Sequence, residues 1–100
     1  MDIKKTQDGN KLLVAVEGRL DTTTAPQLEK EFKESLDGIT DLTVDFQNLE
    51  YISSAGLRVI LSAQKTMNKQ GGMLIKGASD VLMEIFEVTG FVDILNIEGV

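Results

Sequence analysis

The segment LTVDFQNLEYISSAGLRVILSAQKTMN, residues 42–68, places a strand directly before a long amphipathic helix. From Leu42 to Phe46 apolar and polar side chains alternate, as in a strand with one polar side or edge. From about Ser54 to Asn68 apolar residues recur at helical spacing. The inward stripe of this helix is expected to be Leu57, Ile60, Leu61 and Met67. Strands that alternate with helices need crossover connections, which predicts a largely parallel sheet.

The rest of the chain supplies further strands. An apolar run bounded by Gly9-Asn10 and Gly18 predicts a buried strand, and the turn residues before it predict an antiparallel first strand. The predicted strands are Asp2 to Thr6, Leu12 to Val16, Met73 to Ile75 and, at one edge, Ile94 to Ile97.

Two more helices are predicted. The first starts at Thr24-Ala25-Pro26-Gln27, where Thr24 and Gln27 are expected to form a capping box, and it ends at Gly38. The other runs from Asp80 to Val88, capped by Ser79 and closed by Gly90. Its inward residues are expected to be Val81, Leu82, Ile85 and Phe86.

The order β-β-α-β-α-β-α-(β) predicts a single α/β domain over residues 1–100. Its sheet is expected to be mixed, mostly parallel, with four to five strands covered by helices. One hundred residues suffice for one domain and are too few for two.

Composition excludes several classes of function. The chain has no cysteine and no histidine, so it lacks thiolate nucleophiles, disulfides and the commonest general base and metal ligand. A net charge of −6 without a basic stripe argues against nucleic acid. No apolar run approaches the ~18 residues of a membrane span, so we expect no membrane insertion and a cytoplasmic protein. We expect no metal and no cofactor.

Two loops that each join a strand to a helix are candidate sites. In the first, Ser53 or Ser54 is either a plain helix cap or a hydroxyl that is modified or binds an anion, because a helix N-terminus offers unpaired amides. In the second, residues 19–24, the simpler interpretation is capping by Thr24. The carboxyl ends of parallel strands gather at one edge, which would bring Asp21 close to Ser54.

Catalysis is not expected. The acidic set Asp41, Asp45 and Glu50 has the placement of solvated charges beside a strand. A serine hydrolase would need a nucleophile elbow and a base that are absent, and Gly71-Gly72 lacks the lysine and spacing of a phosphate-binding loop.

Three short motifs follow one another along the chain: Gly18-Arg19-Leu20-Asp21 followed by Thr24-Ala25, then Tyr51-Ile52-Ser53-Ser54-Ala55-Gly56-Leu57, and last Phe86-Glu87-Val88-Thr89-Gly90-Phe91. Together they resemble the STAS domain family. They are similar, in this order, to its first signature, its strand-to-helix loop and the end of its third helix. The resemblance covers essentially the whole chain.

This resemblance implies an anti-sigma-factor antagonist with a phosphorylation switch. Its implied partners are an anti-sigma factor that is also a serine kinase and a serine phosphatase that resets the switch. Counting back from Gly56-Leu57 places the phosphoserine on Ser54. Many members carry Asp immediately before it; Ser53 stands there in this chain and is a second candidate hydroxyl. The implied partner-binding residues are Asp21, Thr22, Thr23, Ser53, Ala55, Gly56 and Arg58.

The resemblance leaves alternatives open. A STAS domain can also act without phosphorylation, as an adaptor of a transport system or as a sensor of a small ligand or nucleotide. For the switch, small Ala55 and Gly56 would let a partner approach the backbone closely, and Arg58 and Val59 are expected to be exposed. Phosphorylation is expected to act without conformational change beyond local side chains.

Overall fold

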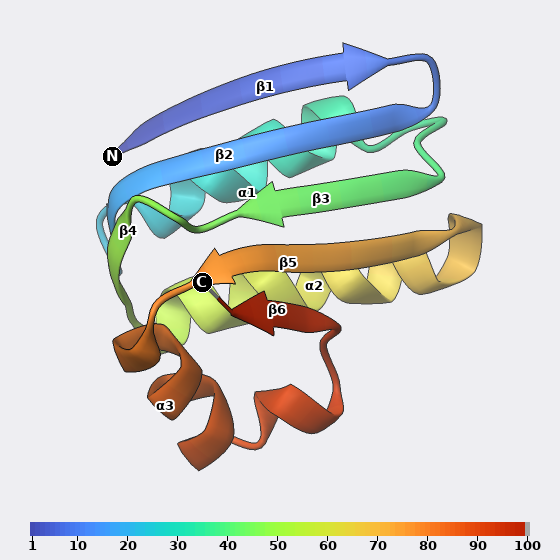
Figure 1. Cartoon of the computed structure of the whole chain (residues 1–100). Helices are drawn as coiled ribbons and strands as arrows, with labels where there is room; N and C mark the ends of the chain where they lie inside the picture. Colours follow the sequence, from blue (N-terminus) through green and yellow to red (C-terminus); the bar gives the residue numbers. More distant parts are fainter. Residues whose placement is uncertain (100) are drawn as a thin grey trace.

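The computed structural model of the chain describes residues 1–99 and forms one mixed sheet with helices packed on it (Figure 1). Six strands and three α-helices follow one another with one short 3₁₀ helix, η1. In chain order these are β1 (Asp2–Asp8), β2 (Lys11–Leu20), α1 (Ala25–Ser35), β3 (Asp41–Asp45), β4 (Leu49–Ile52), α2 (Ser54–Gln70), β5 (Gly72–Ala78), α3 (Asp80–Val88), η1 (Phe91–Asp93) and β6 (Ile97–Gly99).

The sheet has the strand order β1-β2-β3-β5-β6, and β4 pairs with β2 off this path. Among the strands of residues 1–99, only β1 is antiparallel to its neighbour, and all other pairs are parallel. The long strand β2 has two partners in succession: β3 lies beside Lys11 to Ala15, and β4 lies beside Gly18 to Leu20. The predicted mixed, mostly parallel α/β fold is therefore confirmed.

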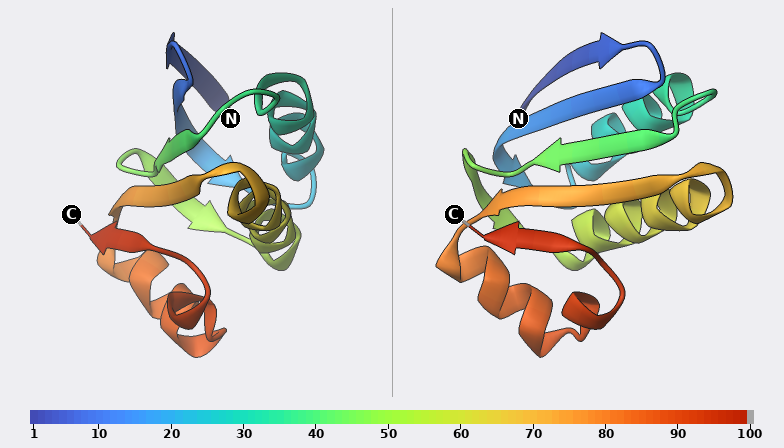
Figure 2. Two further views of the ribbon diagram at one scale, coloured as in Figure 1. Left: turned by 90° about the vertical axis from the view of Figure 1, so that its right-hand side faces the viewer. Right: turned by 45° about the vertical axis from the view of Figure 1, so that its right-hand side comes forward.

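Helices α1 and α2 lie side by side on one face of the sheet, as the two turned views in Figure 2 show. The sheet residues beneath them, such as Val14, Val44 and Ile75, are completely or almost completely buried. Their neighbours on the opposite face, such as Leu13 and Thr43, remain half-buried. Helix α3 packs against β4 and β5 at the carboxyl end of the sheet.

The predicted bounds of the third helix are confirmed, since α3 runs from Asp80 to Val88. Ser79 caps it by accepting a hydrogen bond from the amide of Leu82 at 3.3 Å. One side chain was misplaced: Val81 is 57% exposed, because Leu82 and Phe86 fill the contact with the sheet. The last strand begins only at Ile97, later than predicted, because the chain still turns at Ile94 and Leu95 after η1 ends at Asp93.

The start of α1 differs from the prediction. Thr24 is the N-cap residue but makes no capping hydrogen bond through its side chain, so there is no capping box with Gln27. Its hydroxyl instead donates to the carbonyl oxygen of Arg19 at 2.8 Å and accepts from the amide of Asp21 at 2.9 Å. The helix also ends at Ser35, before the predicted stop at Gly38.

Candidate functional site

The candidate site lies at the carboxyl ends of β2 and β4, which are parallel neighbours. Leu20 pairs with Ile52, and the amide of Ser53 donates to the carbonyl oxygen of Leu20 at 2.8 Å. The chain then enters α1 through the Asp21 loop and α2 through the two serines. The structure thus brings together the two loops that the sequence predicted to meet.

A tight turn, residues 21–24, holds the Asp21 carboxylate. One of its oxygens, Oδ1, accepts hydrogen bonds from the amides of Thr23 and Thr24 at 3.0 and 3.1 Å. These bonds favour the ionised carboxylate, and the bond from the Thr24 amide is the largest cause of the lowered pKa of Asp21. The site therefore carries a fixed negative charge at neutral pH beside the start of α2.

The two serines occupy different positions at the start of α2. Ser53 is the N-cap residue in extended conformation, and its hydroxyl accepts from the amide of Gly56 at 3.4 Å. Ser54 is the first residue inside the helix and is exposed. Within residues 1–99, none of the side-chain hydrogen bonds involves its hydroxyl. Ser54 thus presents a free hydroxyl to solvent, whereas that of Ser53 serves the helix.

Gly56 and Val59 face the interior, which corrects two expectations. Gly56 is buried, and a Cβ built there would lie 2.7 Å from Cγ of Leu20 and 2.9 Å from Cγ1 of Ile52. The glycine is required for close packing of α2 on the ends of β2 and β4, so it offers no backbone to a partner. Val59 is 6% exposed because its side chain, on the inner side of α2, belongs to the hydrophobic core.

A shallow depression lies where the N-terminal turns of α1 and α2 meet, with a volume of about 280 Å³. Three of the predicted partner-binding residues line it: Thr22, Ala55 and Arg58. The lining residues that the sequence did not single out are Ala25, Pro26, Glu29, Val59 and Ser62. Glu29 and Ser62 could have been found from the sequence by helical spacing. Glu29 lies one turn after the start of α1 at Ala25, and Ser62 lies two turns after the start of α2 at Ser54, so each shares a helix face with that first residue. Asp21 and Thr23 belong to the adjoining loop but do not line the depression.

A stacked pair beside the Asp21 loop was also missed from the sequence. The Arg19 guanidinium lies over the ring of Tyr51, 4.5 Å from its centroid, and its Nε is 4.0 Å from Oδ2 of Asp21. Arg19 in β2 and Tyr51 in β4 are cross-strand partners. Because β4 was not predicted as a strand, no signal in the sequence placed them together.

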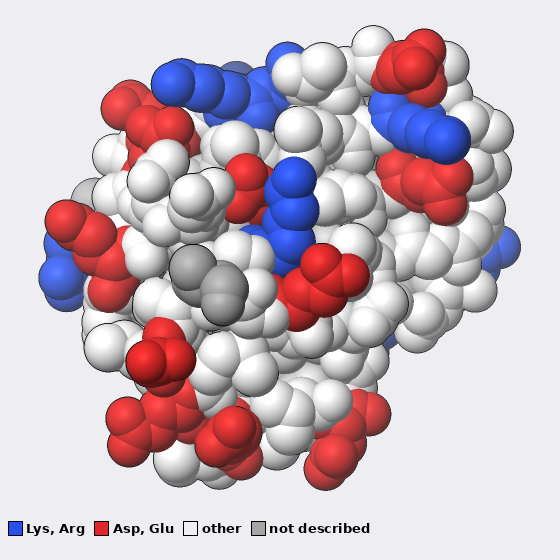
Figure 3. Space-filling view, viewed as in Figure 1, with Lys and Arg blue, Asp and Glu red and all other residues white. Residues whose placement is uncertain are grey.

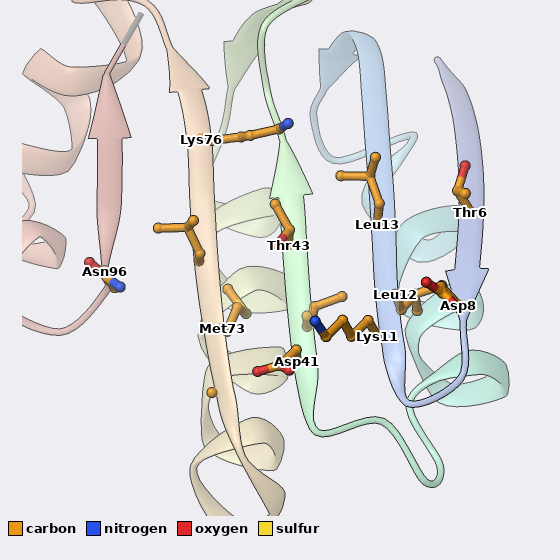
Figure 4. Close-up of a pocket in the computed structure, with 13 residues that line it drawn as sticks. Thr6, Asp8, Lys11, Leu12, Leu13, Asp41, Thr43, Met73, Lys76 and Asn96 are labelled. Atoms are coloured by element: carbon orange, nitrogen blue, oxygen red, sulfur yellow. The ribbon is translucent and has the colours of Figure 1, made fainter.

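A larger cavity lies elsewhere, on the sheet face turned away from α1 and α2 (Figure 4). It has a volume of about 630 Å³ and is an open trough over the middle strands, with Leu13 and Thr43 among its lining residues. Of the three carboxylates considered in the sequence, only Asp41 lines it.

Residues 1–99 contain no group of three or more Asp or Glu side chains placed to hold a metal ion. No helix in this part of the chain is long and apolar enough to cross a membrane.

Comparison with known proteins gives matches over almost the whole chain. A family model described as the STAS domain matches residues 2–99. The anti-sigma-B factor antagonist of Bacillus subtilis is 32% identical over 100 residues, covering 99% of this chain and 90% of that protein.

Solved structures agree on the fold. The crystal structure of an anti-sigma factor antagonist from Mycobacterium paratuberculosis superposes with a TM-score of 0.88 at 20% identity, covering 99% of this chain and 86% of that one. The Bacillus cell fate determinant SpoIIAA in its phosphorylated form gives a TM-score of 0.75 at 14% identity, covering 96% and 90%.

Proposed function

The chain belongs to the STAS domain family, and we propose that it is an anti-sigma-factor antagonist controlled by phosphorylation of Ser54. In this proposal the unphosphorylated protein binds an anti-sigma factor that has serine kinase activity, and so releases a sigma factor for transcription. Phosphorylation ends the binding, and a serine phosphatase restores it. The protein acts in the cytoplasm as a binding module without catalytic activity of its own.

The observation that carries this proposal is the difference between the two serine hydroxyls. The Ser54 hydroxyl is exposed and free of hydrogen bonds within residues 1–99, so a kinase can reach it without breaking a contact. The Ser53 hydroxyl accepts from the Gly56 amide, so its modification would disturb the helix start. The structure of SpoIIAA in a phosphorylated form supports a phosphate on this fold.

The start of α2 suits a phosphate. The amides of Ser54 and Ala55 have no partner among the backbone hydrogen bonds of residues 1–99, whereas the next two amides bond to Ser53. Free amides and the helix dipole stabilise an anion at this position by about 0.3–1 kcal/mol. Arg58, one helical turn further on, is exposed and adds a positive charge on the same side. The phosphoserine can therefore be held without refolding.

The same phosphate disfavours the partner. It adds about −1.5 to −2 charges beside the ionised Asp21 carboxylate. A partner surface shaped for a neutral hydroxyl over the depression at Thr22, Ala55 and Arg58 would meet bulk and unpaired charge. A loss of about 3 kcal/mol would weaken binding roughly 100-fold. In this proposal Asp21, Thr23 and Ser53 lie at the margin of the contact, and buried Gly56 supports it from beneath.

The test uses the anti-sigma factor that co-purifies with this protein from its source, together with ATP. Wild type and Ser53→Ala are expected to gain one phosphate by intact-mass measurement, whereas Ser54→Ala gains none and still binds the anti-sigma factor. Ser54→Asp is expected to bind at least about tenfold more weakly, a cost of about 1.4 kcal/mol. Labelling of Ser54→Ala at the wild-type rate would refute the assignment. So would unchanged affinity of protein carrying one phosphate.

A further inference from the structure

The outward side of α3 carries an apolar row and an acidic row next to each other. Val81, Ile85 and Val88 are spaced i, i+4, i+7 and form the α3 stripe. Asp80, Glu84 and Glu87 have the same spacing and form the acidic row. On a helix such spacing puts side chains on one face, with neighbours about 5–6 Å apart. The two rows therefore run parallel along the helix.

The two ends of the α3 stripe are uncovered in the folded chain, whereas Ile85 between them is half-buried and packs against the core. Val88 is 82% exposed and Val81 57% exposed, although both are β-branched apolar residues on a helix only nine residues long. The contact with the sheet is made by Leu82 and Phe86, which are fully buried on the other side of α3. The core therefore does not require valine at either exposed position.

The apolar surface continues into η1, which packs against α3. Ile94, directly after η1, is 53% exposed, and Val92 within it is 36% exposed. Asp93 lies between them in the chain and is also exposed. The stripe and this segment together give an exposed apolar surface accompanied by carboxylates. Four exposed apolar residues on two elements that pack together exceed the single scattered apolar side chains that are normal on a surface, which favours an interaction site here.

Charge is distributed very unequally along the chain. Up to Lys76 there are eleven acidic residues and ten Lys or Arg, whereas residues 77–100 contain five acidic residues and neither Lys nor Arg. Nearly all of the net charge of −6 therefore belongs to the C-terminal quarter. In Figure 3 the part of the surface over α3 shows acidic side chains without basic ones. The ion pairs found within residues 1–99 all lie before α3.

From these rows we propose that α3 and η1 dock a cationic amphipathic helix of a protein partner, with an apolar row beside a row of Lys or Arg. Its apolar row would cover the α3 stripe, and its basic row would face the acidic row. A second copy of this chain would bring like charges together, and an anionic membrane or nucleic acid would be repelled in the same way. The proposal does not depend on phosphorylation of Ser54.

A synthetic peptide provides the test. It carries Leu in one helical row and Lys in the adjacent row, and a control peptide has the same composition in scrambled order. Amide chemical shifts of the ¹⁵N-labelled full chain are followed during titration. The patterned peptide is expected to shift amides of residues 80–94 and to bind more weakly as ionic strength rises. The scrambled peptide is expected to bind at least about tenfold more weakly, because it cannot present both rows at once.

Two variants examine the two rows. Val81→Ser with Val88→Ser removes exposed apolar groups and is expected to weaken peptide binding about tenfold or more, without loss of the fold. Glu84→Lys with Glu87→Lys is expected to abolish binding. Its matched control, Glu34→Lys with Asp37→Lys, makes the same change in net charge at exposed positions in and just after α1. The control is expected to keep most of the affinity.

Several results would overturn the proposal. These are failure of the patterned peptide to bind, equal binding of the scrambled peptide, shifts spread over the sheet, and equal weakening by the α1 control. Concentration-dependent shifts of α3 amides without any peptide would assign the stripe to a second copy instead. None of these measurements involves the kinase, so failure here is distinguishable from failure of the Ser54 switch.

Discussion

Replacing Gly56 with alanine is expected to destabilise the protein, although alanine is the better helix former. The added Cβ would lie 2.7 Å from Cγ of Leu20, 2.9 Å from Cγ1 of Ile52 and 3.1 Å from Cδ2 of Leu20. Both contacted side chains are at most 2% exposed, so neither can move into solvent. Either the first turn of α2 lifts from the sheet or the ends of β2 and β4 shift.

The magnitude follows from two opposing effects. Overpacking of a filled core costs about 1–3 kcal/mol. The gain in helix propensity from glycine to alanine is at most about 1 kcal/mol. The net expectation is a loss of about 1–2 kcal/mol in the free energy of unfolding. For a domain of this size each kcal/mol lowers the Tm by about 4–8 °C.

Urea denaturation followed by far-UV circular dichroism measures this loss, since the chain has no tryptophan and a single tyrosine. Gly72→Ala is the matched control, because a Cβ there meets nothing within 4 Å. Its stability is expected to stay within about 0.5 kcal/mol of wild type. If Gly56→Ala were as stable as wild type, the packing argument would be wrong. Loss of partner binding in such a stable variant would restore the surface role that the sequence suggested.

Two further predictions concern the same end of the sheet. Ser53→Ala removes the helix cap and is expected to lower the free energy of unfolding by about 1 kcal/mol. Ser54→Ala is expected to stay within about 0.5 kcal/mol of wild type in the same urea assay. Equal losses would contradict the different roles of the two hydroxyls. The pKa of Asp21 is lowered in the folded state, so its carboxylate stabilises the protein at neutral pH, and this contribution is lost as the pH falls through the folded-state pKa. Asp21→Asn should therefore make stability less dependent on pH on the acid side, and an NMR titration that found the Asp21 pKa at or above its ordinary value would refute this.

The sequence predicted the order of elements well because most of them carry a clear periodicity. It missed β4 because Leu49, Glu50, Tyr51 and Ile52 are buried, exposed, exposed and buried, which is not the alternation of a strand. Pairing with β2 also passes through a register shift between Gly18 and Arg19. Gly18 has φ of +96°, which favours glycine, and a local irregularity of this kind is fixed by tertiary contact rather than by pattern.

The start of α1 shows a different kind of error. Thr24 and Gln27 have the spacing of a capping box, but the Asp21 carboxylate accepts from the Thr24 amide, which the Gln27 side chain would have bonded. Sequence rules for caps treat each residue in isolation, whereas here an upstream side chain forms its own turn with them. The error concerned the atoms that make the bonds; the position of the loop was predicted correctly.

At the candidate site, two adjacent serines could not be assigned different roles from residue type alone. Either serine could cap α2 on sequence grounds, and family spacing alone favoured Ser54 as the acceptor of phosphate. The extended backbone of Ser53, with φ −95° and ψ 175°, aims its hydroxyl back at the Gly56 amide, and the helical position of Ser54 leaves its hydroxyl outside. A phosphate on Ser54 would keep the cap intact, so binding could be switched off while the stability of α2 is preserved. A phosphate on Ser53 would remove the cap as well, so loss of binding would be accompanied by a less stable α2. Comparing the unfolding free energies of phosphorylated and unphosphorylated protein therefore tests the choice of serine independently of any partner.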